Sequence, residues 1–345
     1  MKSPFMRNLR ALAFNAKVKV LGRKPLPLRT LWLTLTPPMP KGATIDPVDF
    51  CVLKCPICPT GSATNKYKQS IMPFELFEKI LNDIRSLEEI NLYNWGEPFL
   101  NPKIAEMIRT AKKRGIWTQI SSNLNVRKDL NFWKGIVEAG LDVLMASLDG
   151  ATQKSYEIYR IGGNLDLAIA NLRKITEAKK ALGLKTPKII WRFIVNKYNE
   201  HEVHKAKGMA EELGVDFEIA FFNVGDLSPD SETPDFEEQK SFWLPANKKY
   251  LNEWYIKKRE PLIDTHCPFL WSGPIISPSG KVFPCCHVID ENSAFGDVSK
   301  EPFRSIWHNE KYRYSRSLFS MRKYEGPAIS TVCAGCRNYK RSKGK

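Results

Sequence analysis

The chain has 345 residues, 43% of them hydrophobic, which is enough apolar sequence to bury one large domain and a small one. It has no apolar run long enough to cross a membrane, and its basic start lacks the apolar stretch of a secretory signal. The formal net charge is +16, but residues 1–45 carry nine Lys or Arg and the last nine residues carry five, both without acids. The middle of the chain is therefore nearly neutral, which argues against a nucleic-acid groove through the fold.

The first 42 residues are predicted to be a basic N-terminal extension. Residues 1–24 have the pattern of a basic amphipathic helix, which either packs on the domain or makes peripheral contact with a membrane surface. Packing is the interpretation that we favour. Leu31, Leu33 and Leu35 alternate with other residues and predict a short strand, and prolines then break the chain.

Strand-like and helix-like segments alternate over residues 43–225, the predicted core domain. The strand-like segments are 44–51, 89–94, 117–121, 143–148, 189–195 and 217–222. The helix-like segments are 73–87, 103–114, 128–139, 165–182 and 202–213, and several of them end in glycine. Six such units predict an α/β fold with a parallel sheet, whose functional residues gather at the carboxyl ends of the strands.

Three cysteines follow the first predicted strand in C-x3-C-x2-C spacing: Cys51, Cys55 and Cys58. Three thiolates in one short loop suit a single metal centre, and they leave a four-iron cluster one ligand short. Zinc usually takes four protein ligands in a structural site, so zinc is the weaker interpretation here. Clustered cysteines in a long chain without a signal favour metal binding in a reducing cytosol, and we expect a cytoplasmic protein.

Residues 226–263 interrupt the alternation with an acidic, proline-punctuated stretch followed by aromatic and basic residues. This segment is either a linker or a lid over the substrate pocket.

Residues 264–345 hold a second group of cysteines: Cys267, Cys285, Cys286, Cys333 and Cys336. Residues 277–283 predict a hairpin turn, and the cysteines predict a closed four-ligand site that either iron–sulfur or zinc would satisfy.

The cysteine loop resembles that of the radical S-adenosylmethionine (radical SAM) superfamily. A second landmark agrees, because Asn94-Trp95-Gly96-Glu97-Pro98 ends the second strand where the family carries a Gly-Gly-Glu-Pro-type motif, with Trp95 in place of the first glycine. The resemblance implies a partial (β/α)6 TIM-like barrel in which Asn94, Gly96, Glu97 and Pro98 bind SAM near its amino group. Ile57 stands where the family often has an aromatic residue near the adenine.

The ends of the third and fourth strands carry further motifs of this family. Ser121-Ser122-Asn123 resembles its Thr-Asn-Gly-like turn, which implies that Asn123 binds SAM. The run from Ser147 through Asp149, Gly150 and Tyr156 to Arg160 and Gly162 resembles the motif of the subgroup with auxiliary clusters. The resemblance implies that Ser147 and Arg160 bind the ribose and carboxylate of SAM. An exposed helix cap is the alternative for Arg160.

The second cysteine group resembles the SPASM/twitch extension of the same family. C-x12-G-x4-C followed by C-x2-C matches its spacing, and Ser342 occupies the place of the next cysteine. The resemblance implies one auxiliary [4Fe–4S] cluster, ligated by Cys267, Cys285, Cys333 and Cys336. Cys286 is left over, and we predict a catalytic thiol that returns a hydrogen atom to the substrate; a buried, inert cysteine is the alternative.

The resemblance implies an enzyme that reductively cleaves SAM to a 5′-deoxyadenosyl radical and abstracts hydrogen from a C–H bond. A flavodoxin or ferredoxin-type protein would supply the electron. We favour oxidation or epimerisation of a sugar-like or other small molecule, with no nucleic-acid partner. The alternatives are a peptide-modifying enzyme (an epimerase or a thioether or cyclisation maturase) and a zinc-containing protein that binds nucleic acid through its basic ends.

Overall fold

The computed structural model describes residues 34–63, 69–222, 236–251, 267–288, 290–320 and 322–336. The predicted N-terminal helix, most of the strand around Leu33 and both basic ends lie outside these residues. In the described part of the chain, no helix is both long enough and apolar enough to cross a membrane.

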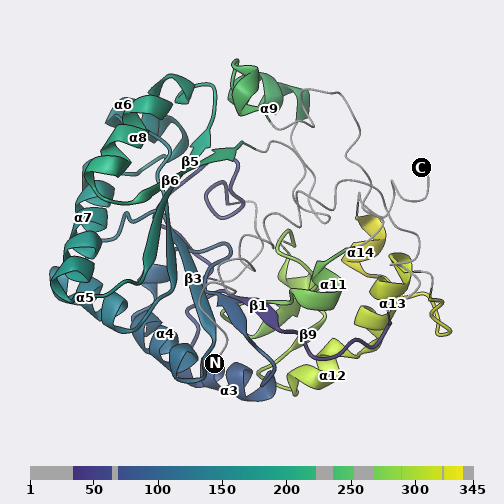
Figure 1. Ribbon diagram of the computed structural model, residues 1–345. Helices are drawn as coiled ribbons and strands as arrows, with labels where there is room; N and C mark the ends of the chain where they lie inside the picture. The colour runs from purple at the N-terminus through teal and green to yellow at the C-terminus, as the bar shows by residue number, and fades with distance from the viewer. Residues whose placement is uncertain are drawn as a thin grey trace.

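In the described residues nine strands form one sheet in the order β6-β5-β4-β3-β2-β1-β7-β8-β9 (Figure 1). The first six strands are parallel: β1 Gly42–Ile45, β2 Glu89–Asn91, β3 Trp117–Ser122, β4 Val143–Ser147, β5 Lys188–Val195 and β6 Asp216–Phe221. They confirm the six predicted strands and their sequential order. Among the described strands β6 lies at one edge of the sheet, and the sheet curves as an open, partial barrel.

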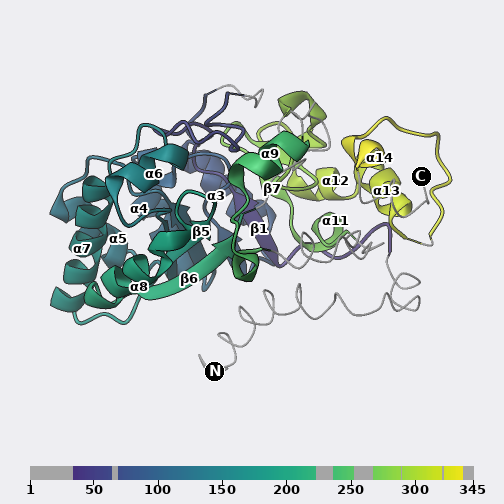
Figure 2. The same ribbon diagram turned by 90° about the horizontal axis from the view of Figure 1, so that it is seen from above.

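Helices cover the outer face of these six strands (Figures 1 and 2). They are α3 Phe74–Asp83, α4 Ile104–Lys113, α5 Leu130–Glu138, α6 Gln153–Tyr159, α7 Leu165–Ala181 and α8 Val203–Glu212. In α4, Ile104, Met107, Ile108 and Ala111 form one buried stripe, as an amphipathic helix on a sheet requires. The glycine after α4, Gly115, has φ of 73°, a left-handed conformation that glycine adopts without strain. The sequence did not predict α6, whose residues lie inside the motif run after β4.

The first strand is shorter than predicted, since β1 ends at Ile45 and not at residue 51. Asp46 makes the last bond of the ladder, from its backbone N–H to the Ile276 carbonyl (2.8 Å), and Pro47 has no N–H to continue it. Residues 46–50 therefore leave the sheet and form the approach to the cysteine loop.

The C-terminal part extends the sheet and adds four short helices (lower right in Figure 1). Strand β7 (Ile275–Ile276) pairs in parallel with β1, and β8 (Lys281–Phe283) and β9 (Gly296–Asp297) continue antiparallel, which confirms the predicted hairpin. The helices are α11 Phe269–Ser272, α12 Phe303–Trp307, α13 Glu310–Leu318 and α14 Val332–Gly335. Main-chain hydrogen bonds thus join the two cysteine-bearing parts through β1.

Part of the segment predicted as linker or lid is described. Helix α9 (Phe236–Trp243) brings Trp243 into stacked contact with Phe222, with ring centroids 5.6 Å apart, and into edge contact with Tyr159 at 5.3 Å. These rings cover the end of β6 beside the cysteine loop.

Candidate functional site

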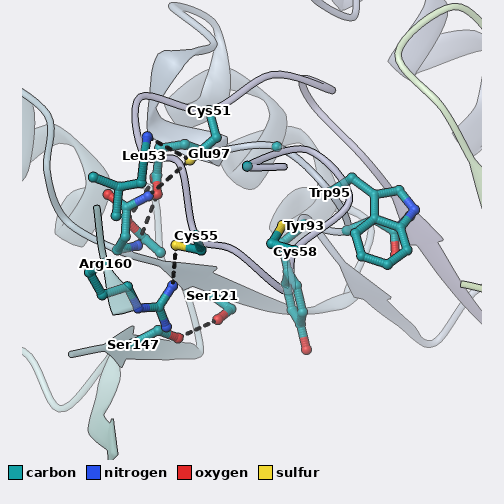
Figure 3. A pocket seen from close by; sticks show the side chains of 15 residues that line it. Cys51, Leu53, Cys55, Cys58, Tyr93, Trp95, Glu97, Ser121, Ser147 and Arg160 are labelled. Atoms are coloured by element: carbon teal, nitrogen blue, oxygen red, sulfur yellow. Dashed lines mark hydrogen bonds between the residues drawn. The ribbon is translucent and has the colours of Figure 1, made fainter. Parts of the chain in front are cut away.

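The three cysteines of the first loop open onto one pocket at the carboxyl ends of β1 to β4 (Figure 3). The pocket has a volume of about 140 Å³. It brings together most of the residues predicted to bind the cluster and SAM: Cys51, Cys55, Cys58, Asn94, Gly96, Glu97, Asn123, Ser147 and Arg160. Pro98 is the exception, because it begins a buried 3-10 turn (Pro98–Leu100) and does not line the pocket.

The three thiols come from one loop and line one pocket, as the ligands of a single cluster would. In an iron–sulfur cluster each thiolate binds its own iron. Burial, with the Glu97 charge, raises the pKa of Cys51 to about 12, so cluster assembly must displace its proton.

Glu97 is a fully buried carboxylate held by three donors. Its Oε1 accepts from the Ser122 hydroxyl (2.7 Å) and the Phe99 N–H (3.2 Å), and its Oε2 accepts from the Asn123 N–H (2.9 Å). Burial raises the pKa of Glu97 to about 7, while these donors stabilise its ionised form. A carboxylate fixed in this way can hold a cationic amino group in the pocket.

The neighbouring Gly96 is required by a close backbone contact. A Cβ on Gly96 would lie 2.0 Å from the Val48 carbonyl oxygen, so no other residue fits without moving the chain. The same turn is held by Asp46, which accepts the N–H groups of Asn94 (3.2 Å) and Trp95 (2.9 Å). Sequence reasoning missed Asp46, although it stands at the carboxyl end of a strand.

Asn123 links the carboxylate to the cysteine loop. Its side-chain N–H donates to Cys51 Sγ at 3.3 Å, while its backbone N–H binds Glu97. The next residue, Leu124, has φ of 57°, the left-handed conformation that a glycine in a Thr-Asn-Gly-like turn would supply. The turn therefore aims Asn123 at a sulfur of the loop.

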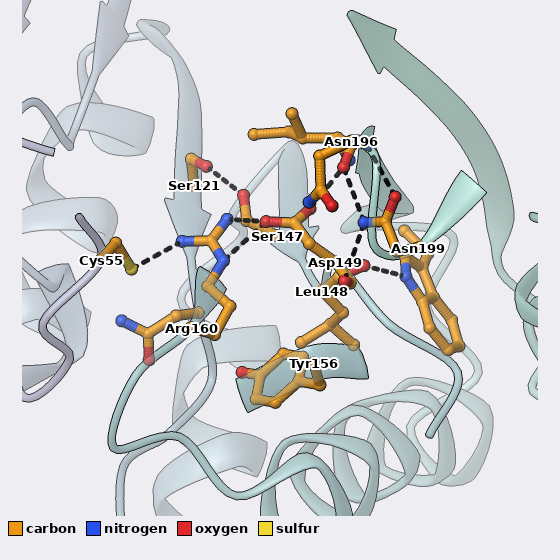
Figure 4. A network of polar contacts seen from close by, with 12 residues as sticks. Cys55, Ser121, Ser147, Leu148, Asp149, Tyr156, Arg160, Asn196 and Asn199 are labelled. Carbon is orange, nitrogen blue, oxygen red and sulfur yellow. Dashed lines mark hydrogen bonds and ion pairs between the residues drawn. The ribbon is translucent and has the colours of Figure 1, made fainter. Parts of the chain in front are cut away.

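Arg160 is not an exposed cap but the centre of a buried network (Figure 4). Its Nε and Nη2 both lie 2.7 Å from Asp149 Oδ2, and its Nη1 donates to Cys55 Sγ at 3.7 Å. Asp149 is fully buried and also accepts the Ile194 N–H (2.8 Å). Asp149 thus orients Arg160 towards the loop, which argues against a role for this carboxylate as a free base.

A second, apolar pocket of about 230 Å³ adjoins the first and shares Cys58 and Trp95 with it. Its other lining residues are Ile57, Pro59, Tyr159, Ile194, Phe221 and Phe222. Flat apolar walls of this kind suit a planar ring.

Polar side chains continue the wall of the first pocket across the inner face of the barrel. Ser147 contacts the Ser121 hydroxyl (3.1 Å) and pairs in register with Arg192 on β5, whose Nη2 lies 3.0 Å from Glu218 Oε1 on β6. Tyr93 also lines the pocket and accepts a hydrogen bond from the Gln119 amide (2.9 Å). Sequence reasoning missed Tyr93, Gln119 and Arg192. Each is half-buried and follows a residue that is buried beneath the helices, so each side chain lies on the opposite, inner face of the sheet.

The second cysteine group also gathers in space. Burial raises the pKa of Cys285, and the charges of Cys286, Cys333 and Cys267 raise it further. Burial likewise raises the pKa of Cys333, as do the charges of Cys267 and Cys336. Cys267, Cys285 and Cys333 therefore lie close to one another, and Cys336 lies near Cys333. Cys286 lies beside them, and its charge also acts on the Tyr93 phenol, which lines the first pocket.

Comparisons with known proteins agree with this geometry. Residues 45–205 match the model of the radical SAM superfamily, and residues 267–337 match the SPASM iron–sulfur cluster-binding domain. A cofactor-modifying protein for the tungsten-containing aldehyde ferredoxin oxidoreductase of Pyrococcus furiosus is 25% identical over 83% of this chain and 84% of its own length. The AdoMet-dependent heme synthase of Methanosarcina barkeri is 24% identical over 83% and 88%.

The fold is similar to that of a solved enzyme, Streptococcus suis SuiB bound to S-adenosylmethionine. The TM-score is 0.60 at 16% identity, over 88% of this chain and 72% of that one.

An open barrel with a three-cysteine loop and a second cysteine domain defines an iron–sulfur enzyme that uses SAM. The chain belongs to the radical SAM superfamily and carries a SPASM/twitch-type domain. It binds a [4Fe–4S] cluster and SAM in the barrel and an auxiliary iron–sulfur cluster in the C-terminal domain. The alternative of a zinc-containing protein is therefore wrong. The domain boundaries and the individual ligands stay predictions.

Proposed function

We propose that the chain oxidises or epimerises a polar small molecule by removing a hydrogen atom from one of its C–H bonds. The observation that carries this proposal is the convergence of Cys51, Cys55 and Cys58 on a pocket that also holds Glu97 and Arg160. The three thiolates would ligate the first cluster and leave one iron open. With SAM bound there, the cluster, reduced by an electron-donor protein, would pass one electron to SAM and split it into methionine and a 5′-deoxyadenosyl radical, which would take the hydrogen atom.

We assign each part of SAM to a different residue around the pocket. Glu97 would bind the amino group, and Arg160, oriented by Asp149, would bind the carboxylate. Ser147 would bind the ribose, and the apolar pocket next to Ile57 would hold the adenine. These contacts orient the cofactor and exclude water from the reacting centre.

The inner face of the barrel supports a polar substrate. Tyr93, Gln119, Arg192 and Glu218 offer donors and acceptors next to the SAM pocket. Arg192 is already paired with Glu218, so a neutral group such as a hydroxyl or an amide would meet less repulsion there than a second anion. A substrate rich in hydroxyl groups fits this surface.

Cys286 is the proposed hydrogen-atom donor for an epimerisation. It lies in the auxiliary loop, and burial raises the pKa of its thiol to about 11, so the thiol keeps its hydrogen at neutral pH. The proximity of Cys286 to Tyr93 supports a position on the substrate side of the pocket.

A peptide substrate is the second candidate. A PqqA peptide cyclase of Methylobacterium sp. is 24% identical over 80% of this chain and 75% of its own length. SuiB has also been solved with its precursor peptide SuiA, at a TM-score of 0.58 and 16% identity over 91% of this chain and 72% of that one.

Anaerobic reconstitution tests the proposal. The purified protein should be brown and hold about eight irons per chain, four for each cluster. The Cys51→Ala/Cys55→Ala/Cys58→Ala variant should lose about half of the iron and form no 5′-deoxyadenosine. Deuterated sugars, cyclitols and peptides would then be compared for deuterium transfer into 5′-deoxyadenosine. Transfer from peptides alone would contradict the small-molecule proposal, and an iron-free preparation would contradict the cluster assignment.

A further inference from the structure

A buried arginine stands in the C-terminal domain, away from the SAM pocket. Arg316 lies on α13 and has 0% of its surface exposed. Its guanidinium donates to three backbone carbonyls: Leu270 (2.8 Å), Trp307 (2.7 Å) and Leu35 (3.0 Å). It also packs 4.3 Å from the centroid of the Trp307 ring and 4.7 Å from that of Tyr312.

The guanidinium of Arg316 is a buried positive charge. Among the described residues no carboxylate forms an ion pair with it, and its Nη2 atom is buried without a hydrogen-bond partner. Burial lowers the pKa of Arg316 to about 10, so it stays protonated at neutral pH. A buried charge is costly unless an opposite charge stands near it. Within the described part of the chain this charge is therefore balanced by carbonyl dipoles and aromatic rings and by no acid.

Three cysteines of the second group lie near the Tyr312 ring, which packs against this cation. The Tyr312 hydroxyl donates to the Phe283 carbonyl (3.3 Å), two residues before Cys285. Burial raises the pKa of Tyr312, and the charges of Cys333, Cys285 and Cys267 raise it further. The tyrosine ring therefore has the guanidinium against it and the cysteines close by.

Residues next to Arg316 in the sequence and in space also contact the segments that carry the cysteines. Ser315 forms a side-chain hydrogen bond with Cys333. The Leu270 carbonyl, which accepts from Arg316 Nε at 2.8 Å, stands three residues after Cys267. Both the α13 backbone and the guanidinium thus adjoin the segments that carry the cysteines.

We propose that Arg316 is the buried counter-cation of the auxiliary iron–sulfur cluster and that it raises the reduction potential of that cluster. The proposal rests on the ligand set Cys267, Cys285, Cys333 and Cys336. A cluster ligated by four thiolates is anionic, and reduction adds one more negative charge. A fixed positive charge in a water-excluded site stabilises the reduced state more than the oxidised state, so the potential rises.

The test is an EPR-monitored redox titration of the anaerobically reconstituted, full-length protein. The auxiliary signal is the one that does not change when SAM is added. In Arg316→Gln the equilibrium constant for reducing this cluster should fall on the order of tenfold, which is about 59 mV for one electron. Arg316→Lys keeps the charge and should retain most of the wild-type potential. Arg313→Gln removes an exposed charge from the same helix and should change nothing.

Each outcome decides the role of the charge. Arg316→Gln with full iron content and an unchanged potential would overturn the proposal. If Arg316→Gln does not assemble the auxiliary cluster, the Arg316→Lys variant decides. A cluster with a near-wild-type potential in Arg316→Lys would support the role of the positive charge. Failure of Arg316→Lys to assemble the cluster would show that the hydrogen bonds of the guanidinium matter and not its charge. 5′-Deoxyadenosine formation is measured in parallel. If Arg316→Gln cleaves SAM normally and its auxiliary cluster has an unchanged potential, Arg316 is not the counter-cation, and the proposed function is unaffected. A wild-type chain without a second cluster would overturn both the ligand set and the counter-cation.

Discussion

Replacing Glu97 with glutamine tests the geometry of the SAM pocket most directly. The carboxylate is 1% exposed and all three of its hydrogen bonds come from donors. A glutamine has one acceptor oxygen and one NH2 group. If the oxygen keeps the Ser122 and Phe99 donors, the NH2 group faces the Asn123 N–H, and that buried donor loses its acceptor.

The expected effects follow from these contacts. An unsatisfied buried donor costs about 1–3 kcal/mol, so Glu97→Gln should lower the free energy of unfolding by about that amount. A hydrogen bond to a charged group contributes about 1.5–3 kcal/mol. If Glu97 binds the amino group of SAM, its loss should weaken SAM binding roughly 10- to 150-fold.

The affinity for SAM should also depend on pH, in a direction set by the protonation of Glu97. Burial raises the pKa of Glu97 to about 7, so the carboxyl takes up a proton as the pH falls through that value. A protonated carboxyl attracts a cationic amino group less. Wild-type affinity for SAM should therefore fall between pH 8 and pH 6, and this contribution should be absent in Glu97→Gln.

Equilibrium dialysis of SAM under anaerobic conditions, with iron content measured on each sample, would provide the dissociation constants. Glu106→Gln is the matched control, because the Glu106 side chain on α4 is 44% exposed and pairs with the exposed Lys103, away from the pocket. A Glu97→Gln protein with full iron content and wild-type affinity at every pH would refute the role of this carboxylate.

Three further changes test other parts of the molecule. Cys286→Ala should abolish an epimerised product while 5′-deoxyadenosine still forms, and an unchanged product by mass spectrometry would exclude the thiol as hydrogen donor. Asp149→Asn leaves Arg160 buried without its charge partner and should destabilise the fold by about 3–5 kcal/mol, whereas Asp216→Asn, in an exposed pair, should leave the melting temperature unchanged. Asn171→Ala removes three buried hydrogen bonds and should cost at least about 3 kcal/mol in denaturant titration; a loss below about 1 kcal/mol would contradict the estimate.

Local patterns carried most of the fold prediction. Strand-like runs between helix-like runs located all six parallel strands, and the glycines after the helices marked the helix ends, as the φ of 85° at Gly140 shows. The cysteine spacing located the pocket, because the first three cysteines sit in one loop of eight residues at the end of β1. Such features depend on neighbours in the chain, and a single sequence displays them.

Long-range partners could not be predicted in this way. Asp46 binds a turn 48 residues away, and Arg160 binds Cys55 105 residues away. The sequence showed Arg316 as one of 53 basic residues, and only the packing of α13 reveals that it is buried. These contacts are set by tertiary packing, which has no period along the chain.

Strand β1 is the element on which both sites depend. Its carboxyl end leads into the first cysteine loop, its one edge pairs with β2, and its other edge pairs with β7 of the cysteine-rich domain. Asp46 at its end holds the backbone of Trp95, and the Trp95 indole N–H reaches the Val288 carbonyl (3.3 Å), two residues past Cys286. Main-chain pairing and this turn therefore link the two sites through the same strand.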